Sequence, residues 1–84
     1  MAKEWQVYLV KCADGTLYCG ITKNIGSRIE RHNAGRGAKY TAARRPVTLL
    51  DVSGRMELKT AMKEERYIKR LRRNEKLHYL QLLK

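Results

Sequence analysis

The sequence WQVYLVKCADGTLYCGI, residues 5–21, decides the fold. Its two halves, Trp5–Cys12 and Thr16–Ile21, are rich in β-branched and aromatic residues, and Asp14-Gly15 stands between them. Segments of this composition joined by Asp-Gly are typical of a β-hairpin. The stretch therefore predicts two antiparallel strands at the start of the chain.

The register of this hairpin follows from its apolar pattern. A two-residue turn would mix apolar residues over both faces and would point Tyr8 and Tyr18 to opposite sides. A three-residue loop ending in a left-handed Gly15 instead collects one almost purely apolar face. That face holds Trp5, Val7, Leu9, Leu17, Cys19 and Ile21. We therefore predict that Val10 pairs with Tyr18 and Tyr8 with Gly20, which makes the tyrosines diagonal neighbours and leaves space for a ligand over Gly20.

The rest of the chain predicts further helices and one more strand within a single domain, residues 1–84. These are a helix capped by Asn24 that ends at about Asn33, a basic loop over Gly35–Pro46, a strand over Val47–Val52, a helix over about Met56–Arg72 and a short helix capped by Asn74. The order is ββαβαα, and the fold class is α+β.

Charge is the strongest signal in the composition. The 84 residues carry 19 Lys and Arg against 8 acidic residues, a net charge of +11, which favours a polyanionic partner. A merely solubilising charge is the alternative. The basic residues are spread over several elements, which argues against a membrane surface. Five tyrosines and one tryptophan are too few for an extended platform that stacks nucleic acid bases.

No membrane span or export signal is expected. No run approaches the roughly 18 apolar residues of a membrane span, and no signal peptide opens the chain. We therefore expect a cytoplasmic protein. Cys12 and Cys19 are the only cysteines, lack zinc-site spacing and fall on opposite faces of the predicted hairpin, so we expect no disulfide.

The first predicted helix adds two residues to the tyrosine face. Ile25 and Ile29 mark its buried stripe. Arg28 and His32 are four residues apart and lie along one edge of that stripe, close to the sheet. Either one also fits an ordinary helix residue with no special role.

Glu65 is the anomaly of the long helix. Leu58, Ala61, Met62 and Ile68 form an apolar stripe, and Glu65 falls within it, whereas Glu64 points away. A carboxylate at a core-facing position is costly unless it is paired or bound to a metal ion. The periodicity leaves two interpretations open: a buried pair with an arginine, or an oxygen ligand for Mg²⁺.

These residues resemble the signature of the GIY-YIG nuclease superfamily. Gln6-Val7-Tyr8 and Tyr18-Cys19-Gly20 correspond to its two tripeptides, although Gln6, Val7 and Cys19 depart from the letters of the name. The resemblance continues through Asn24, Arg28, His32, residues 37–41, Arg45-Pro46 and residues 61–69. It covers almost the whole chain and is greatest to small, stand-alone bacterial members. Val7 and Cys19 would face the core, whereas Gln6 could narrow the pocket.

The resemblance implies a small α/β sandwich around a three-stranded antiparallel sheet. It also implies cleavage of DNA phosphodiester bonds with one divalent ion, Mg²⁺ or Mn²⁺. The implied catalytic residues are Tyr8, Tyr18, Arg28 and His32, and the implied metal ligand is Glu65. Of the tyrosines, we favour Tyr18 as the general base and Tyr8 as the group that orients water or phosphate. Arg28 would stabilise the charge that develops on the phosphate.

The basic loop and the long helix supply candidate contacts to the nucleic acid backbone. These are Arg36, Lys39, Tyr40, Thr41, Arg44, Arg45 and Lys69. A solvated charged face is the alternative for each of them. No segment resembles a base-reading helix, so we expect little sequence specificity.

The leading hypothesis is a monomeric, metal-dependent endonuclease that acts on structured DNA such as a flap, branch or damaged end. Such an activity would suit DNA repair or recombination, and a protein partner could direct it to its target. The first alternative is a nucleic-acid-binding module with this fold and little activity. The second is an RNA-associated factor, since charge does not separate DNA from RNA.

Overall fold

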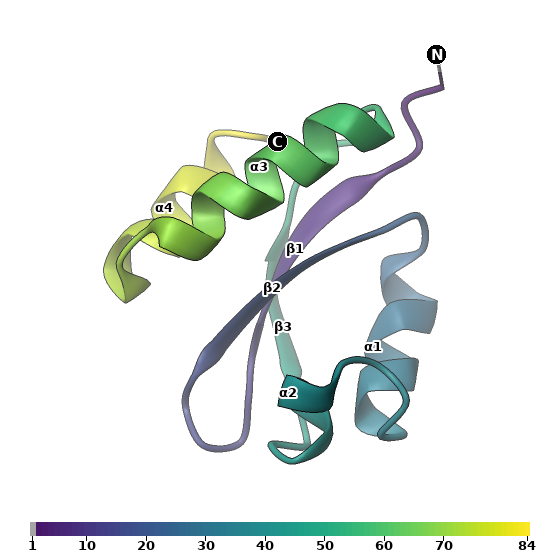
Figure 1. Cartoon of the computed structure of the whole chain (residues 1–84), viewed down its shortest axis with the longest axis vertical. Coiled ribbons are helices and arrows are strands. Elements are labelled where there is room, and N and C mark those ends of the chain that lie inside the picture. The colour runs from purple at the N-terminus through teal and green to yellow at the C-terminus, as the bar shows by residue number, and fades with distance from the viewer. Residues whose placement is uncertain (1) are drawn as a thin grey trace.

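A three-stranded antiparallel sheet with strand order β2-β1-β3 forms the centre of this computed structural model, which describes residues 2–84. Its elements are β1 (Gln6–Lys11), β2 (Leu17–Thr22), α1 (Ile25–Asn33), α2 (Lys39–Ala42), β3 (Thr48–Val52), α3 (Leu58–Arg70) and α4 (Arg73–Gln81). Helices α3 and α4 cover one face of the sheet, and α1 lies on the other side (Figure 1). The α+β class and the ββαβαα order are confirmed, with the short helix α2 added inside the basic loop.

The hairpin has the predicted register. Tyr8 lies opposite Gly20, and Val10 lies opposite Tyr18. The N–H of Cys12 donates to the carbonyl of Thr16 at 2.8 Å, which closes a three-residue loop. Gly15 has a φ of 86°, the left-handed conformation that this loop requires at its last position.

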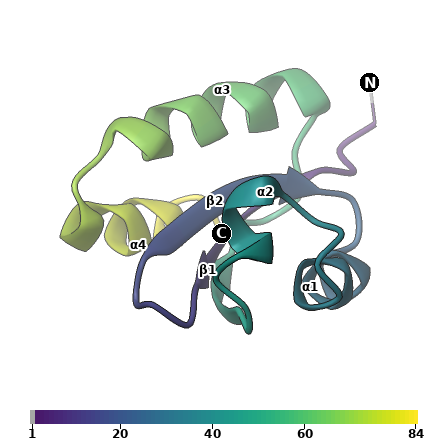
Figure 2. The same ribbon diagram turned by 60° about the horizontal axis from the view of Figure 1, so that its bottom comes forward.

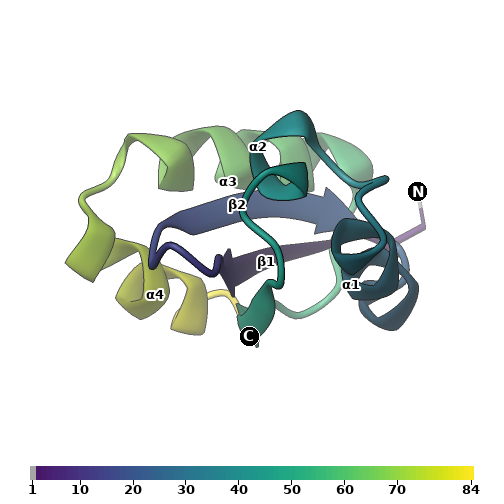
Figure 3. The same cartoon turned by 90° about the horizontal axis from the view of Figure 1, so that it is seen from below.

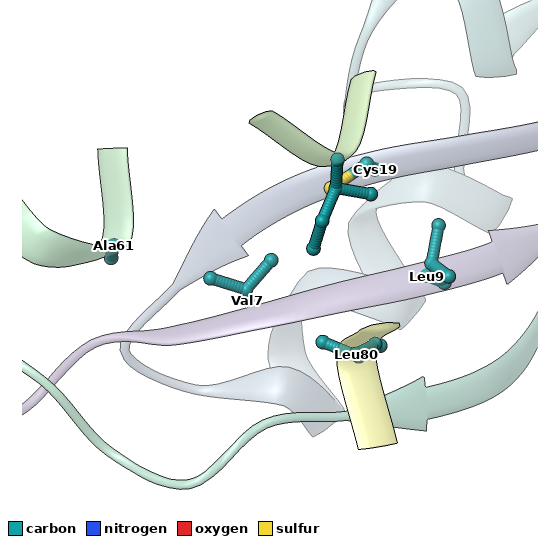
Figure 4. Packing of buried hydrophobic residues seen from close by; sticks show 6 residues of the cluster. Val7, Leu9, Cys19, Ala61 and Leu80 are labelled. Carbon is teal, nitrogen blue, oxygen red and sulfur yellow. The ribbon is translucent and has the colours of Figure 1, made fainter. Parts of the chain in front are cut away.

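The central strand β1 is buried on both faces. On one face, Val7 and Leu9 pack with Cys19 and with side chains of α3 and α4, among them Ala61 and Leu80 (Figure 4). On the other face, a second cluster comprises Tyr8, Val10, Cys12 and Val47, with Ile25 and Ile29 of α1 packed against it. Both cysteines are free and belong to different clusters, as expected.

Helix α1 begins and ends where the sequence predicts. The Oδ1 of Asn24 accepts a hydrogen bond from the N–H of Ser27 at 3.0 Å and so caps the helix. Gly35 follows the end of the helix with a φ of 81°, the usual conformation after a helix C-terminus. Because both ends of α1 are fixed in this way, Arg28 and His32 lie on the side of the helix that packs against the sheet.

Two details of the other helices differ from the prediction. Leu58 and Met62 of α3 are 42% and 43% exposed, although they belong to the apolar stripe. Because α3 runs along β2 (Figure 2), an edge strand of a narrow sheet, only part of that stripe lies over the core. Helix α4 begins at Arg73, so Asn74 lies in its first turn and does not cap it. The Glu75 carboxylate instead accepts a hydrogen bond from the N–H of Arg72.

None of the helices within residues 2–84 combines the length and apolar character that a membrane crossing requires.

Candidate active site

Five side chains from four elements meet on the α1 side of the sheet, and we call them the polar cluster. They are Tyr8 of β1, Tyr18 of β2, Arg28 and His32 of α1, and Thr41 of α2. Figure 3 shows α1 and α2 close to this part of the sheet. The structure thus brings together four predicted catalytic residues and one residue predicted to bind nucleic acid.

A chain of buried hydrogen bonds runs through the cluster from β1 to α2. The Tyr8 hydroxyl lies 2.8 Å from Nε2 of His32, and the Thr41 hydroxyl lies 2.7 Å from Nδ1 of the same ring. Since the Thr41 hydroxyl donates to the carbonyl of Ala38 at 3.1 Å, it accepts from Nδ1. Nε2 is then the acceptor for the Tyr8 hydroxyl. His32 is therefore a neutral imidazole that links Tyr8 to Thr41.

The ionisation of these groups agrees with that hydrogen bonding. Burial lowers the pKa of His32, and the positive charge of Arg28 lowers it further. Burial also raises the pKa of Tyr8, against the opposing effect of Arg28. The hydrogen bond to Tyr8 is the main cause that raises the pKa of Arg28. At neutral pH the cluster thus holds a protonated Tyr8, a neutral His32 and a charged Arg28.

Two glycines allow this packing. A Cβ atom on Gly20 would lie 2.3 Å from the Tyr8 hydroxyl oxygen, and a Cβ on Gly37 would lie 2.3 Å from Nδ1 of His32. The space over Gly20 is therefore filled by the phenol of Tyr8, whereas the sequence suggested that it would be free for a ligand. No pattern in the sequence indicated a role for Gly37. Its close approach to the His32 ring depends on how the α1–α2 loop folds back onto α1, which no local pattern reports.

The two tyrosines differ in access. Tyr8 is completely buried, and Tyr18 is half-buried with its ring 5.5 Å from that of His32. The Nε of Arg28 donates to the Tyr8 hydroxyl at 3.2 Å and holds the guanidinium beside both phenols. Tyr18 is thus the more exposed of the two phenols, and Tyr8 is joined to Arg28 by a hydrogen bond.

A stack of two tyrosine rings flanked by cations lies beside β2. The ring of Tyr40 stacks on Tyr18 at 5.9 Å, and the Arg44 guanidinium lies 3.8 Å above the centre of the Tyr40 ring. The ammonium of Lys69 lies 5.7 Å from the centre of the Tyr18 ring. Arg44 also forms an ion pair with Asp14 at 3.0 Å, so it joins the hairpin loop to α2.

Glu65 lies on α3, which packs against the edge strand β2. Burial raises the pKa of the Cys19 thiol to about 12, and the negative charge of Glu65 adds to this rise. Glu65 pairs with Lys69 at 3.4 Å, and its side chain is 23% exposed. The observed pair is therefore with a lysine and is only partly buried. Lys69 connects Glu65 to Tyr18, because its ammonium contacts both.

The residues present fit a magnesium ion held by one carboxylate. Within residues 2–84, no three His, Cys, Asp or Glu side chains converge as a metal cage. Mg²⁺ is commonly held by one or two carboxylates together with water and substrate phosphate, so a cage is not required. Glu65 is partly exposed and its pair with Lys69 is an ordinary i,i+4 pair, which leaves its oxygens available to an ion.

The other predicted contacts to nucleic acid fall into two groups. Arg36, Lys39 and Arg45 are exposed, and Tyr40 and Lys69 belong to the stack beside β2. Thr41, in contrast, is completely buried and hydrogen-bonded to His32. Its side chain therefore stabilises the polar cluster and is not exposed to a nucleic acid backbone. The side chain of Gln6 donates to the carbonyl of Ser53 at 2.9 Å, which ties it to the end of β3.

The sequence matches the GIY-YIG catalytic domain over residues 4–78. This chain belongs to the GIY-YIG family. It is 50% identical to a UPF0213 protein of Bacillus cereus over 74 residues, 88% of this chain and 77% of that protein. It is 47% identical to a UPF0213 protein of Staphylococcus haemolyticus over 81 residues, 96% and 98% of the two chains.

A solved structure resembles the fold of this chain. It is the solution NMR structure of a UPF0213 protein from Bacillus halodurans, which has 35% sequence identity and a TM-score of 0.55. The similarity covers 93% of this chain and 83% of that one. Family membership supports a nuclease-like function.

Proposed function

We propose that this protein is a metal-dependent endonuclease that hydrolyses phosphodiester bonds in DNA and selects its substrate by structure. The observation that carries the proposal is the position of Tyr18. Its half-buried phenol lies beside Arg28, and Lys69, which pairs with Glu65, lies 5.7 Å from its ring. A phosphate placed against Tyr18 would meet a charged guanidinium and be next to the carboxylate that suits a divalent ion.

Each member of the site has a separate task in this proposal. Tyr18 is the general base, because it is the signature tyrosine that is only partly buried. Arg28 uses Nε to hold Tyr8, which leaves both Nη groups for two hydrogen bonds to a phosphate. Tyr8 stays protonated and fixes Arg28, and His32 and Thr41 fix Tyr8.

Glu65 would hold the divalent ion, Mg²⁺ or Mn²⁺. When bound, this ion would neutralise phosphate charge and stabilise the leaving oxygen. The exposed cations Arg36, Lys39 and Arg45 would neutralise neighbouring phosphates. Such contacts read the backbone and not the bases, so the preferred substrate would be a shape, such as a flap or branch, as expected for repair or recombination.

The test is a nuclease assay with Mg²⁺ or Mn²⁺ on single-stranded, duplex and branched DNA, with branched RNA included. We expect cleavage by the natural sequence, none by Glu65→Gln, and a loss of about 100-fold or more in Arg28→Ala. The matched control is Glu64→Gln, because Glu64 lies beside Glu65 but accepts a hydrogen bond from Tyr79 at 3.1 Å. Tyr18→Phe should lose activity without loss of DNA binding.

Three outcomes would contradict the proposal. Equal cleavage by Glu65→Gln and Glu64→Gln would indicate a contaminating nuclease and remove Glu65 as the metal ligand. Salt-sensitive binding with no cleavage by any variant would indicate a binding module with this fold. Cleavage of branched RNA alone would change the substrate class.

A further inference from the structure

A hollow lies directly beside the polar cluster, between the start of β1 and helix α1. Its volume is about 340 Å³, and its lining includes Trp5, Ile21, Lys23, Ser27, Arg28 and Arg31. Arg28 belongs to both the polar cluster and the hollow. Its Nε donates to the Tyr8 hydroxyl, and its side chain also lines the hollow. A group bound in the hollow would therefore be adjacent to a phosphate on Arg28.

The charge of the hollow suits a phosphate. Three cations line it, and no acidic side chain of residues 2–84 is among its lining. Arg31 is exposed, and within the described part of the chain its side chain makes no hydrogen bond or ion pair. Lys23 pairs only with Glu4, at 3.6 Å, and both side chains are more than half exposed. Such a pair is weak, so Lys23 is available to a stronger anion.

The floor of the hollow suits a base or a sugar. Trp5 is half-buried, packs against the core and lines the hollow together with Ile21. The ammonium of Lys23 lies 5.5 Å from the centre of the Trp5 ring, a cation–π contact with the face of the indole. A nucleobase could take the place of the ammonium over the indole, while Lys23 turns to the phosphate.

We propose that this hollow binds one unpaired nucleotide next to the scissile phosphate, with its base on Trp5 and its phosphate on Lys23 and Arg31. This inference rests on the proposed function, since the neighbouring phosphate is the one on Arg28. A base inside a duplex has its faces covered by its neighbours and cannot stack on an indole. The hollow thus selects single-stranded ends, flaps or gaps. One indole supplies one stacking contact, which is compatible with the low aromatic content of the chain.

Fluorescence tests the inference directly, because Trp5 is the only tryptophan. The titrant is a 5′-phosphorylated oligothymidylate of about six nucleotides in EDTA, so no cleavage is needed. We expect saturable quenching of Trp5 by the single strand and little by a blunt duplex. Lys23→Gln and Arg31→Gln should each weaken binding about fivefold or more and lower the slope of log K against log salt by about 0.7.

The matched control is Lys63→Gln, which removes one charge from an exposed position of α3 and should change affinity less than about twofold. Trp5→Leu should weaken binding of a fluorescein-labelled oligonucleotide, read by anisotropy, about tenfold. Trp5→Phe keeps an aromatic ring against the core and should lose less, which controls for a loss of folding.

Binding seen by anisotropy with unchanged Trp5 fluorescence would overturn the inference. So would equal effects of Arg31→Gln and Lys63→Gln, equal quenching by blunt duplex, or no binding at all. The nuclease assay distinguishes this inference from the proposed function. Quenching without cleavage would support nucleotide binding in the hollow and contradict the endonuclease activity. Cleavage without quenching would support the endonuclease activity and contradict nucleotide binding in the hollow.

Discussion

The two faces of the sheet are both buried, but they are filled in different ways. The face under α3 and α4 contains only apolar side chains at its centre, such as Val7, Leu9 and Ile68. The face toward α1 buries two polar side chains completely, His32 and Thr41, together with the whole of Tyr8. One face therefore excludes hydrogen-bonding groups, and the other one depends on them.

The apolar face mainly stabilises the fold, whereas the polar face fixes the orientation of side chains. An apolar contact has no direction, so the α3 face stabilises the fold in proportion to the area it buries. A buried polar group is costly unless it is bonded, and each bond fixes an orientation. Within residues 2–84, every buried side-chain nitrogen and oxygen atom has a partner. The α1 face thus fixes Tyr8 and Arg28 in one arrangement, as a site requires.

The largest expected effect on stability is on the apolar face. Leu9→Ala removes a completely buried side chain from the central strand and should lower the free energy of unfolding by about 2–5 kcal/mol. Urea unfolding measures this change. Leu50→Ala, at a side chain of β3 that is 38% exposed, is the control and should cost less than about 1 kcal/mol. The cleavage rate per folded molecule should stay unchanged in both variants; a large loss in Leu9→Ala would mean that the two faces are not separable.

A smaller loss of stability with a larger loss of activity is expected on the polar face. Gly20→Ala places a Cβ 2.3 Å from the hydroxyl of a buried Tyr8, which must move and take Arg28 with it. We expect a loss of about 1–3 kcal/mol in stability and about 100-fold in cleavage. The measurements are urea unfolding and the cleavage rate under saturating DNA.

Gly26→Ala is the matched control for Gly20→Ala. A Cβ on Gly26 would meet only the side chain of Asn24, at 3.7 Å, and alanine favours the helix by about 0.5–1 kcal/mol. This variant should be as stable as the natural sequence or more so, with unchanged cleavage. Equal activity of the two alanine variants would show that the position of Tyr8 is unimportant.

The sequence predicted the parts of this molecule that depend on local pattern. The alternation of apolar residues required a three-residue loop, and that loop put Tyr8 and Tyr18 on one face. Helical spacing placed Arg28 and His32 beside them, and Asn24 capped their helix. Each of these inferences needed only neighbours in the chain or in one hairpin.

The remaining features depend on contacts that no local pattern contains. The hydrogen bond between His32 and Thr41 requires α2, a single helical turn inside a loop that reads as irregular. The exposure of Leu58 and Met62 depends on how far α3 extends beyond the sheet, which periodicity does not report. The partner of Glu65 is a lysine one turn away, whereas the periodicity left open a buried pair with an arginine or a metal ion.

The smallest expected effect is the dependence of stability on pH, and it too distinguishes the two faces. The pKa of His32 is lowered in the folded protein, chiefly by burial and then by Arg28, from an ordinary value of 6.5. Below pH 6.5 the unfolded chain binds a proton that the folded chain does not, so stability falls as the pH drops toward the lowered pKa. Above pH 6.5 both states are neutral, and the contribution of His32 is fully present. The urea midpoint should therefore decrease between pH 7.5 and pH 5.5.

Replacement of each histidine in turn assigns this pH dependence. The chain has two histidines, and His78 is exposed on α4, far from the polar cluster in sequence. His78→Gln should keep the decrease between pH 7.5 and pH 5.5, whereas His32→Gln should be less stable at pH 7.5 and should lose most of the decrease. Leu9→Ala should lower the midpoint at every pH and leave the decrease in place, because the apolar face contains no group that titrates in this range. If the decrease survived in His32→Gln, another group would be its source, and the assignment of a neutral imidazole between Tyr8 and Thr41 would lose this support.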